Sequence, residues 1–232
     1  MFQDFLTTQK TQPPAISPFW FAAMMAVLVL VLLISVKYPK SRWLNGTFKG
    51  LQVFQLLSLY TWYIAFGLPL ANSLPFYHCR LAMFVLVFLP GKSAIKQFFA
   101  LLGFAGSIFA LVYPVFDPYS WPHITGFSFL IGHYALLGNA TLYLMNHYDF
   151  RSLSYGKIIG FTFLLDAFQV AVNLLTGGNY GLMKVAPVLG TRFVPFNYLL
   201  VSTILAATLC LINWFLKKRR EPKLSEADSF DS

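Results

Sequence analysis

Long apolar runs alternate with short polar connections along most of this 232-residue chain. Seven such runs are bounded by Lys, Arg, Pro, Gly or Asp, and they cover residues 19–36, 51–71, 75–90, 95–116, 124–145, 158–175 and 194–216. A helix of about 20 residues crosses the hydrocarbon core of a bilayer. The pattern predicts an all-α bundle of seven transmembrane helices. The third run is the shortest, and its flanking prolines favour a tilt or a kink.

Composition supports a membrane protein rather than a soluble one. Hydrophobic residues make up 57% of the chain and charged residues only 11%, whereas a soluble domain carries roughly a quarter charged residues. We expect one transmembrane domain over residues 19–216, without a second folded unit. Residues 1–18 and the basic-then-acidic tail at 217–232 are expected to be unstructured. No small-x-small cleavage site follows the first run, which predicts a retained helix rather than a signal peptide.

Lys and Arg predict the orientation of the bundle. With the N-terminus outside, thirteen basic residues lie inside, and only Lys10, Lys184 and Arg192 lie in the outer segments. This asymmetry favours an extracytoplasmic N-terminus and a cytoplasmic C-terminus. The basic residues are scattered over loops, so no nucleic-acid partner is expected. The run Lys217–Arg220 is typical of a stop-transfer anchor, with contact to anionic lipid headgroups as the alternative. The short loops favour a bacterial plasma membrane.

A polar stripe crosses the sixth apolar run. Asp166, Gln169 and Asn173 follow i, i+3, i+7 spacing and share one helix face, which Gly177 continues. Lipid cannot satisfy such a face, so it is expected to point into the bundle. Gln169 and Asn173 are compatible with helix–helix hydrogen bonds worth about 1 kcal/mol each, or with a site. For Asp166 a functional role is favoured, because an ionisable carboxyl at that depth needs a partner.

Cys79 and His133 form the candidate nucleophile–base pair. Both fall in the outer half of the predicted bundle, on separate helices, and a thiolate with a neighbouring imidazole can carry an acyl group. Arg80 favours the thiolate, whereas His78 lies about 100° around the helix from Cys79. A hydrogen-bonded core histidine is the alternative for His133. Cys210 is expected to be a small buried residue, and ligand spacing predicts neither a metal nor a cofactor.

The residues around this cysteine resemble a known signature. Leu74-Pro75-Phe76-Tyr77-His78-Cys79-Arg80-Leu81-Ala82-Met83 resembles the "LPLHLC-x-LAM" motif of the YwaF-like integral membrane family. The resemblance covers about residues 45–215 and continues in order through Asp117–His123, Phe129–His133, Asn173, Gly178-Asn179-Tyr180, Leu189-Gly190, Pro195 and Tyr198. That family is grouped with transmembrane protein 164, described as a lipid acyltransferase, and is likened to androgen-induced-gene membrane hydrolases.

The resemblance implies an acyl-accepting Cys79 with His133 as its base. The signature places its histidine two residues before the cysteine, where this chain has Tyr77, so the role of His78 stays open. The expected reaction is attack on an ester of a membrane phospholipid or another acyl lipid in the outer leaflet, ending in acyl transfer or hydrolysis. Asp166 is expected to orient His133.

The remaining candidate residues are assigned to substrate binding or to the developing oxyanion; they are His78, Arg80, His123, Gln169, Asn173, Asn179 and Tyr180. Two other functions stay open. In a proton- or ion-coupled transporter, Asp166 and His133 would form a relay. In a non-enzymatic membrane partner subunit, the same polar groups and the glycines would serve assembly.

Overall fold

The computed structural model describes residues 2–185 and 190–228, and side-chain surroundings for 4–185 and 190–219. The described chain is all helical, as predicted, and holds no strand. Its helices are α1 (Phe2–Phe5), α2 (Pro18–Lys37), α3 (Arg42–Ala65), α4 (Leu70–Ser73), α5 (His78–Phe88), α6 (Ala94–Val112), α7 (Ile124–His147), α8 (Tyr155–Thr176), the short 3₁₀ helix η1 (Tyr180–Leu182) and α9 (Val194–Asp228).

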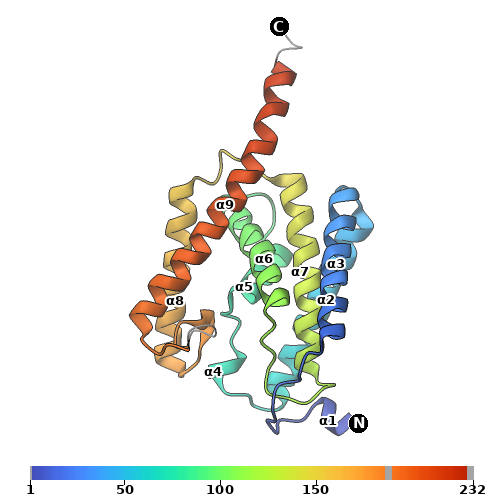
Figure 1. Cartoon of the computed structure of the whole chain (residues 1–232), viewed down its shortest axis with the longest axis vertical. Coiled ribbons are helices and arrows are strands. Elements are labelled where there is room, and N and C mark those ends of the chain that lie inside the picture. Colours follow the sequence, from blue (N-terminus) through green and yellow to red (C-terminus); the bar gives the residue numbers. More distant parts are fainter. Residues whose placement is uncertain (1, 186–189, 229–232) are drawn as a thin grey trace.

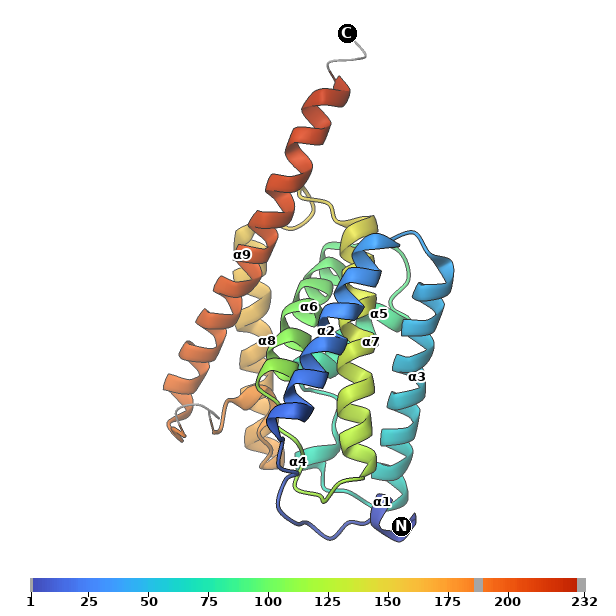
Figure 2. The ribbon, with the colours of Figure 1, turned by 45° about the vertical axis from the view of Figure 1, so that its right-hand side comes forward.

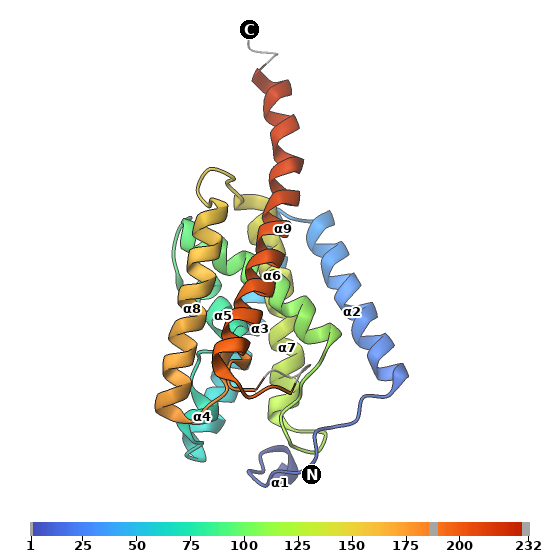
Figure 3. The same ribbon diagram turned by 60° about the vertical axis from the view of Figure 1, so that its left-hand side comes forward.

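Helix α7 is the centre of the bundle. It packs against α2, α3, α5 and α6, while α8 and α9 form a pair on the opposite flank, seen side by side in Figures 1 and 3. Figure 2 shows α2 and α3 on either side of α7. The N-terminus, α1 and α4 lie at one end, here called the N-terminal end, and α9 projects beyond the other (Figure 1).

Side-chain caps fix where most of the long helices begin. Ser17, Ser41, Ser93 and Ser154 accept hydrogen bonds from the first-turn backbone of α2, α3, α6 and α8, and His123 does the same for α7. Helix α5 has no such cap, because Tyr77 at that position makes no side-chain hydrogen bond to the backbone.

The seven apolar runs all coincide with helices, but both ends of α3 differ from the prediction, and α6 ends at Val112 rather than at residue 116. Helix α3 begins at Arg42 rather than residue 51 and ends at Ala65 rather than residue 71. Its first turns bury Leu44 and Phe48 at i, i+4 spacing, an amphipathic pattern hidden among polar residues. Beyond its end, the positive φ of Gly67 turns the chain away.

Within the described residues, four helices are long and apolar enough to cross a membrane: α2, α6, α8 and the part of α9 over Val194–Arg219. The chain is therefore a multi-pass membrane protein. Helices α3 and α7 have 24 residues each but a more polar composition. Helix α5 has 11 residues, about 16 Å at 1.5 Å per residue, which is too short to cross a bilayer alone. Crossing by all seven helices stays a prediction, as does their orientation.

Two hydrogen bonds connect the N-terminal segment to the bundle. Trp62 Nε1 donates to the carbonyl of Leu6 at 2.9 Å, and the amide of Thr11 donates to the carbonyl of Pro118 at 2.8 Å. These bonds hold the segment across the N-terminal end of the bundle, which its composition alone could not indicate. At the other terminus α9 continues to Asp228, and residues 229–232 lie outside the described chain, as does Leu189 of the signature.

Candidate functional site

Helix α5 begins inside the bundle, after an extended segment over residues 74–77. Tyr180 fixes this segment: its hydroxyl donates to the carbonyl of Leu70 at 2.5 Å and accepts from the amide of Leu74 at 3.0 Å. The Tyr180 ring also lies edge-on to Tyr77, with centroids 4.8 Å apart. A fully buried tyrosine from the loop after α8 thus positions the start of α5.

The polar stripe of α8 holds the same segment. Asp166 accepts from His78 Nε2 at 2.6 Å and from Ser202 Oγ of α9 at 2.7 Å. Gln169 Nε2 donates to the carbonyl of Phe76 at 2.7 Å. The stripe points into the bundle as predicted, where lipid cannot reach it, and it ties α8 to the first turn of α5.

These bonds give Asp166 a different histidine partner from the expected one. The two carboxylate oxygens of Asp166 bond His78 and Ser202, so His78 rather than His133 is its imidazole partner. Helix periodicity predicts that Asp166 faces the inside of the bundle, but it does not predict which histidine bonds to it.

The amides expected to stabilise an oxyanion are engaged elsewhere. Gln169 holds Phe76, Asn173 Nδ2 donates to the carbonyl of Tyr180 at 2.8 Å, and Asn179 Nδ2 donates to the carbonyl of Val185 at 3.1 Å. All three side-chain amides donate to backbone carbonyls, and these hydrogen bonds hold loops and helix ends in place.

Cys79 and His133 belong to one layer of the bundle. Helices α5, α6 and α7 meet at Ala82, Gly103 and Leu136, because a Cβ added to Gly103 would lie 2.9 Å from Leu136 and 3.4 Å from Ala82. Cys79, Gly106 and His133 are each three residues from these positions, on the side of the N-terminal end of the bundle. They therefore lie at the same level as one another.

Contacts at this layer seat the thiol and bring a charge near both groups. A Cβ on Gly106 would lie 2.9 Å from Cys79 Sγ, so the thiol rests on the bare backbone of α6. The positive charge of Arg80 acts on both the thiol and the imidazole.

One nitrogen of His133 is already committed. Its Nδ1 is 2.7 Å from the carbonyl of Phe129, and a carbonyl only accepts, so Nδ1 carries the proton. In the neutral ring Nε2 is then the acceptor, which is the state a general base needs. The Phe129 ring packs against the imidazole at 4.4 Å and fixes its orientation. Next to it, Gly132 admits close approach by Met83, as the sequence predicted.

Backbone amides at the start of α5 lie beside the thiol. The first N–H groups of any helix have no hydrogen-bond partner within the helix. In α5 the side chain of Tyr77, at the N-cap position, does not accept a hydrogen bond from them either. The amides of His78, Cys79 and Arg80 therefore begin α5 beside the thiol. They bring the positive end of the helix dipole to that point.

His123 makes hydrogen bonds at the N-terminal end of the bundle, and its expected contact with substrate stays a prediction. It is buried at the start of α7, where Nδ1 accepts from the amide of Thr125 at 3.3 Å and Nε2 donates to the carbonyl of Thr7 at 3.0 Å. Its ring stacks on Tyr119 at 4.1 Å. Burial lowers the pKa of His123, so the ring is neutral at pH 7.

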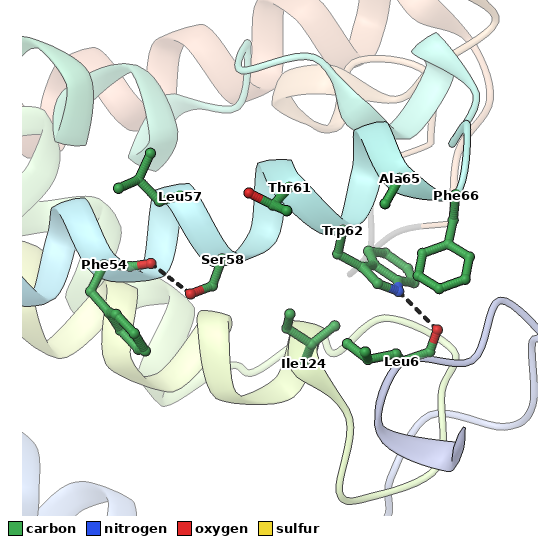
Figure 4. Close-up of a pocket in the computed structure, with 9 residues that line it drawn as sticks. All are labelled: Leu6, Phe54, Leu57, Ser58, Thr61, Trp62, Ala65, Phe66 and Ile124. Atoms are coloured by element: carbon green, nitrogen blue, oxygen red, sulfur yellow. Dashed lines mark hydrogen bonds between the residues drawn. The ribbon is translucent and has the colours of Figure 1, made fainter. Parts of the chain in front are cut away.

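A hollow of about 460 Å³ lies on the outer side of α3, away from this layer (Figure 4). Apolar side chains form most of its wall, with Ser58 and Thr61 among them, and Leu6 of the N-terminal segment closes one end. The hydroxyl of Ser58 donates to the carbonyl of Phe54 on its own helix, so no nucleophile–base pair faces the hollow.

Several important residues were not found from the sequence. Ser202 donates a hydrogen bond to the carboxylate of Asp166. Tyr60 and Tyr63 pack around Arg80, as described below. A lone serine or tyrosine in an apolar run is common, and only helix packing shows which ones converge. Among the described residues, no three His, Cys, Asp or Glu side chains gather as a metal site would require. Both cysteines are free.

Comparison with known proteins gives one match. The model of the TMEM164 family matches residues 5–216, which include every helix from α2 to α8 and α9 as far as Leu216. No curated protein and no solved structure matches the chain.

Proposed function

The chain belongs to the TMEM164 family, and from this premise we propose that it is a membrane-embedded lipid acyltransferase or lipid hydrolase. One observation carries the proposal: Cys79 begins a helix inside the bundle, in the same layer as a histidine whose Nε2 is free to accept a proton. The narrower YwaF-like label stays a prediction.

In the first half-reaction the cysteine takes the acyl group. His133 Nε2 removes the thiol proton of Cys79, and the sulfur attacks the carbonyl carbon of a lipid ester. The amides that begin α5 stabilise the resulting oxyanion. The C–O bond to the glycerol oxygen then breaks, and that oxygen takes the proton from the imidazolium. The products are a thioester on Cys79 and a lysolipid alcohol.

The second half-reaction frees the enzyme. An alcohol of an acceptor lipid, or water, gives its proton to His133 and attacks the thioester carbonyl. The C–S bond breaks, and the sulfur regains the proton. Transfer and hydrolysis differ only in this acceptor. Arg80 follows Cys79 directly in the sequence, and a neighbouring cation is the kind of group that favours a thiolate in both halves.

Acyl transfer by purified protein tests the proposal. In liposomes containing an isotopically labelled phospholipid and an unlabelled lysolipid, the wild type is expected to yield labelled product or labelled fatty acid. We expect Cys79→Ala to abolish this activity and His133→Ala to lower it about 100-fold or more. Cys210→Ala is the matched control, because Cys210 is also a free cysteine but lies on α9, outside the proposed site. Unchanged activity in both Cys79→Ala and His133→Ala contradicts the proposal.

A second function is favoured by the buried pair of His78 and Asp166. An imidazole and a carboxylate 2.6 Å apart, with Ser202 beside them, are the components of a proton relay, so proton-coupled transport is the rival. It predicts that Asp166→Asn changes proton flux or uptake by proteoliposomes, while Cys79→Ala leaves it unchanged. The acyltransferase proposal predicts no flux in either protein.

A further inference from the structure

Arg80 is a cation enclosed by tyrosines near the N-terminal end of the bundle. Its guanidinium carbon lies 5.0 Å from the ring centre of Tyr77, 5.3 Å from Tyr63 and 5.9 Å from Tyr60. Its Nη2 donates to the hydroxyl of Tyr63 at 2.7 Å. The rings come from α3 and from the extended segment before α5, so this cluster lies on the α3 side of Cys79.

Two hydrogen-bond donors in this cluster are buried without a partner. They are Arg80 Nη1 and the hydroxyl of Tyr60. Among the described residues no carboxylate makes an ion pair with Arg80, and the charge of the exposed Asp117 acts on it only from a distance. Removing a cation from water without a counterion is costly, and aromatic rings offset only part of that cost.

We propose that this cluster is an anion-binding site that takes a phosphate group, supplied by a membrane phospholipid. Arg80 Nη1 and the Tyr60 hydroxyl would donate to the phosphate oxygens. A guanidinium fork suits a phosphate, and the backbone amides at the start of α5 add a second source of positive potential. The proposal deepens the acyltransferase function, because it places the headgroup of the lipid one residue from Cys79.

Depth in the bundle favours a lipid phosphate. Tyr63 and Tyr60 lie two and five residues before the end of α3 at Ala65, or about 3 and 8 Å at 1.5 Å per residue. His133 lies nine residues into α7 from Ile124, about 13 Å from that end. A phospholipid carries its phosphate nearer the interface and its esters deeper. This order matches Arg80 followed by the layer of Cys79 and His133.

Binding without chemistry tests this site. Protein carrying Cys79→Ala is loaded with a diether phospholipid, which has the phosphate but no acyl ester, or with the matching dialkylglycerol, which lacks the phosphate. Lipid retained after detergent washing is measured by native mass spectrometry. We expect about tenfold better retention of the phospholipid. Arg80→Gln should remove this preference, Arg80→Lys should weaken it, and Tyr60→Phe should lower it about threefold.

Matched controls separate the site from folding. Tyr198→Phe removes a hydroxyl that donates to the carbonyl of Phe163 between α9 and α8, and it should retain the full preference. Tyr60→Phe removes a hydroxyl without a partner, so it keeps the test open if Arg80→Gln fails to fold.

The outcomes also separate the sources of the anion. Displacement of the diether lipid by millimolar inorganic phosphate, weakened in Tyr60→Phe, would support the site as a phosphate site. Binding of inorganic phosphate without lipid preference would overturn its lipid assignment. Equal retention of both lipids, or preference for a free fatty acid, would overturn the proposal. Because the probe lipid has no acyl ester, failure here leaves the acyl-transfer test unaffected.

Discussion

At the scale of single residues, the pairing of histidines with other groups decides which polar residues do chemistry. His78 precedes the cysteine in the chain and His133 lies in the same layer of the bundle, but Asp166 bonds His78, whereas His133 Nδ1 donates to the carbonyl of Phe129. The arrangement differs from a triad with a carboxylate as third member. His78 and Asp166 position the first turn of α5, and His133 keeps a nitrogen for proton transfer.

A double-mutant cycle tests this division of roles. We expect His78→Ala and Asp166→Asn to be strongly coupled in thermal stability, by about 0.5–3 kcal/mol, because each removes the other's buried partner. The pair His133→Ala and Asp166→Asn should be additive. Unfolding of the purified variants in detergent measures both cycles. Coupling between Asp166 and His133, and none with His78, would restore the triad that the sequence suggested.

Sequence predicted the types of residues at the site better than their partners. The spacing of Asp166, Gln169 and Asn173 gave the correct inward face, since helix periodicity alone determines it. The partners of these side chains depend on how α5 and the loop before α9 fold back into the bundle. Tyr180, which fixes that segment, looked like a loop residue and is fully buried.

At the scale of the elements, the close approach of α5 to α6 seats the thiol. Gly106 offers no side chain, and a Cβ there would lie 2.9 Å from Cys79 Sγ. Gly106→Ala is therefore expected to displace the sulfur and lower acyl transfer about tenfold, the size that a misplacement of 1 Å or less can produce.

Gly160→Ala is the control for this change. It makes the same substitution inside a helix, where nothing lies within 4 Å of the added Cβ. Both variants gain helix propensity, so a difference between them reports the contact with Cys79. Equal acyl-transfer activities of Gly106→Ala and Gly160→Ala would show that the close contact between Cys79 Sγ and Gly106 is not required.

The N-terminal segment is expected to loosen in acid. Burial is the main cause that lowers the pKa of His123 below 6.5, while the Thr7 carbonyl and Asp117 oppose it. The unfolded segment thus binds the proton more readily, so the stabilisation is complete above about pH 6.5 and declines below it. Protonated Nδ1 cannot accept from Thr125.

Hydrogen exchange of the amide of Thr11 from pH 7.5 to 5 measures this loss. His123→Asn keeps an acceptor for the start of α7 and should abolish the pH dependence, after correction for the intrinsic exchange rate. Protection of Thr11 that is independent of pH in the wild type would contradict the role given to His123.

At the scale of the whole molecule, the positions of the helices follow from the apolar runs, because lipid and core select the same side chains. The start of α3 was missed because Asn45, Gly46 and Lys49 read as a loop, although Leu44 and Phe48 alternate with them on a buried face. The break before α5 was visible only as two prolines and a short run. Its depth in the bundle depends on contacts with α8 that no local pattern contains.

Orientation in the membrane is a separate prediction of the charge distribution. In a protein without Cys79 and Cys210, Gln9→Cys should react with an impermeant maleimide in intact cells, and Lys218→Cys should react only after permeabilisation. Both positions are exposed, so accessibility depends on the side of the membrane. The reverse labelling pattern would place the N-terminal end, and Arg80 with it, on the cytoplasmic side.

The most direct measurement of the central claim is the mass of the cysteine peptide after reaction. Purified wild-type protein is mixed with an isotopically labelled phospholipid without an acceptor, quenched in acid and digested. We predict the labelled acyl group on Cys79, removed by neutral hydroxylamine as a thioester and greatly reduced in His133→Ala. Lipid turnover by the wild type with no acyl group on Cys79, or turnover that persists in Cys79→Ala, would contradict the account.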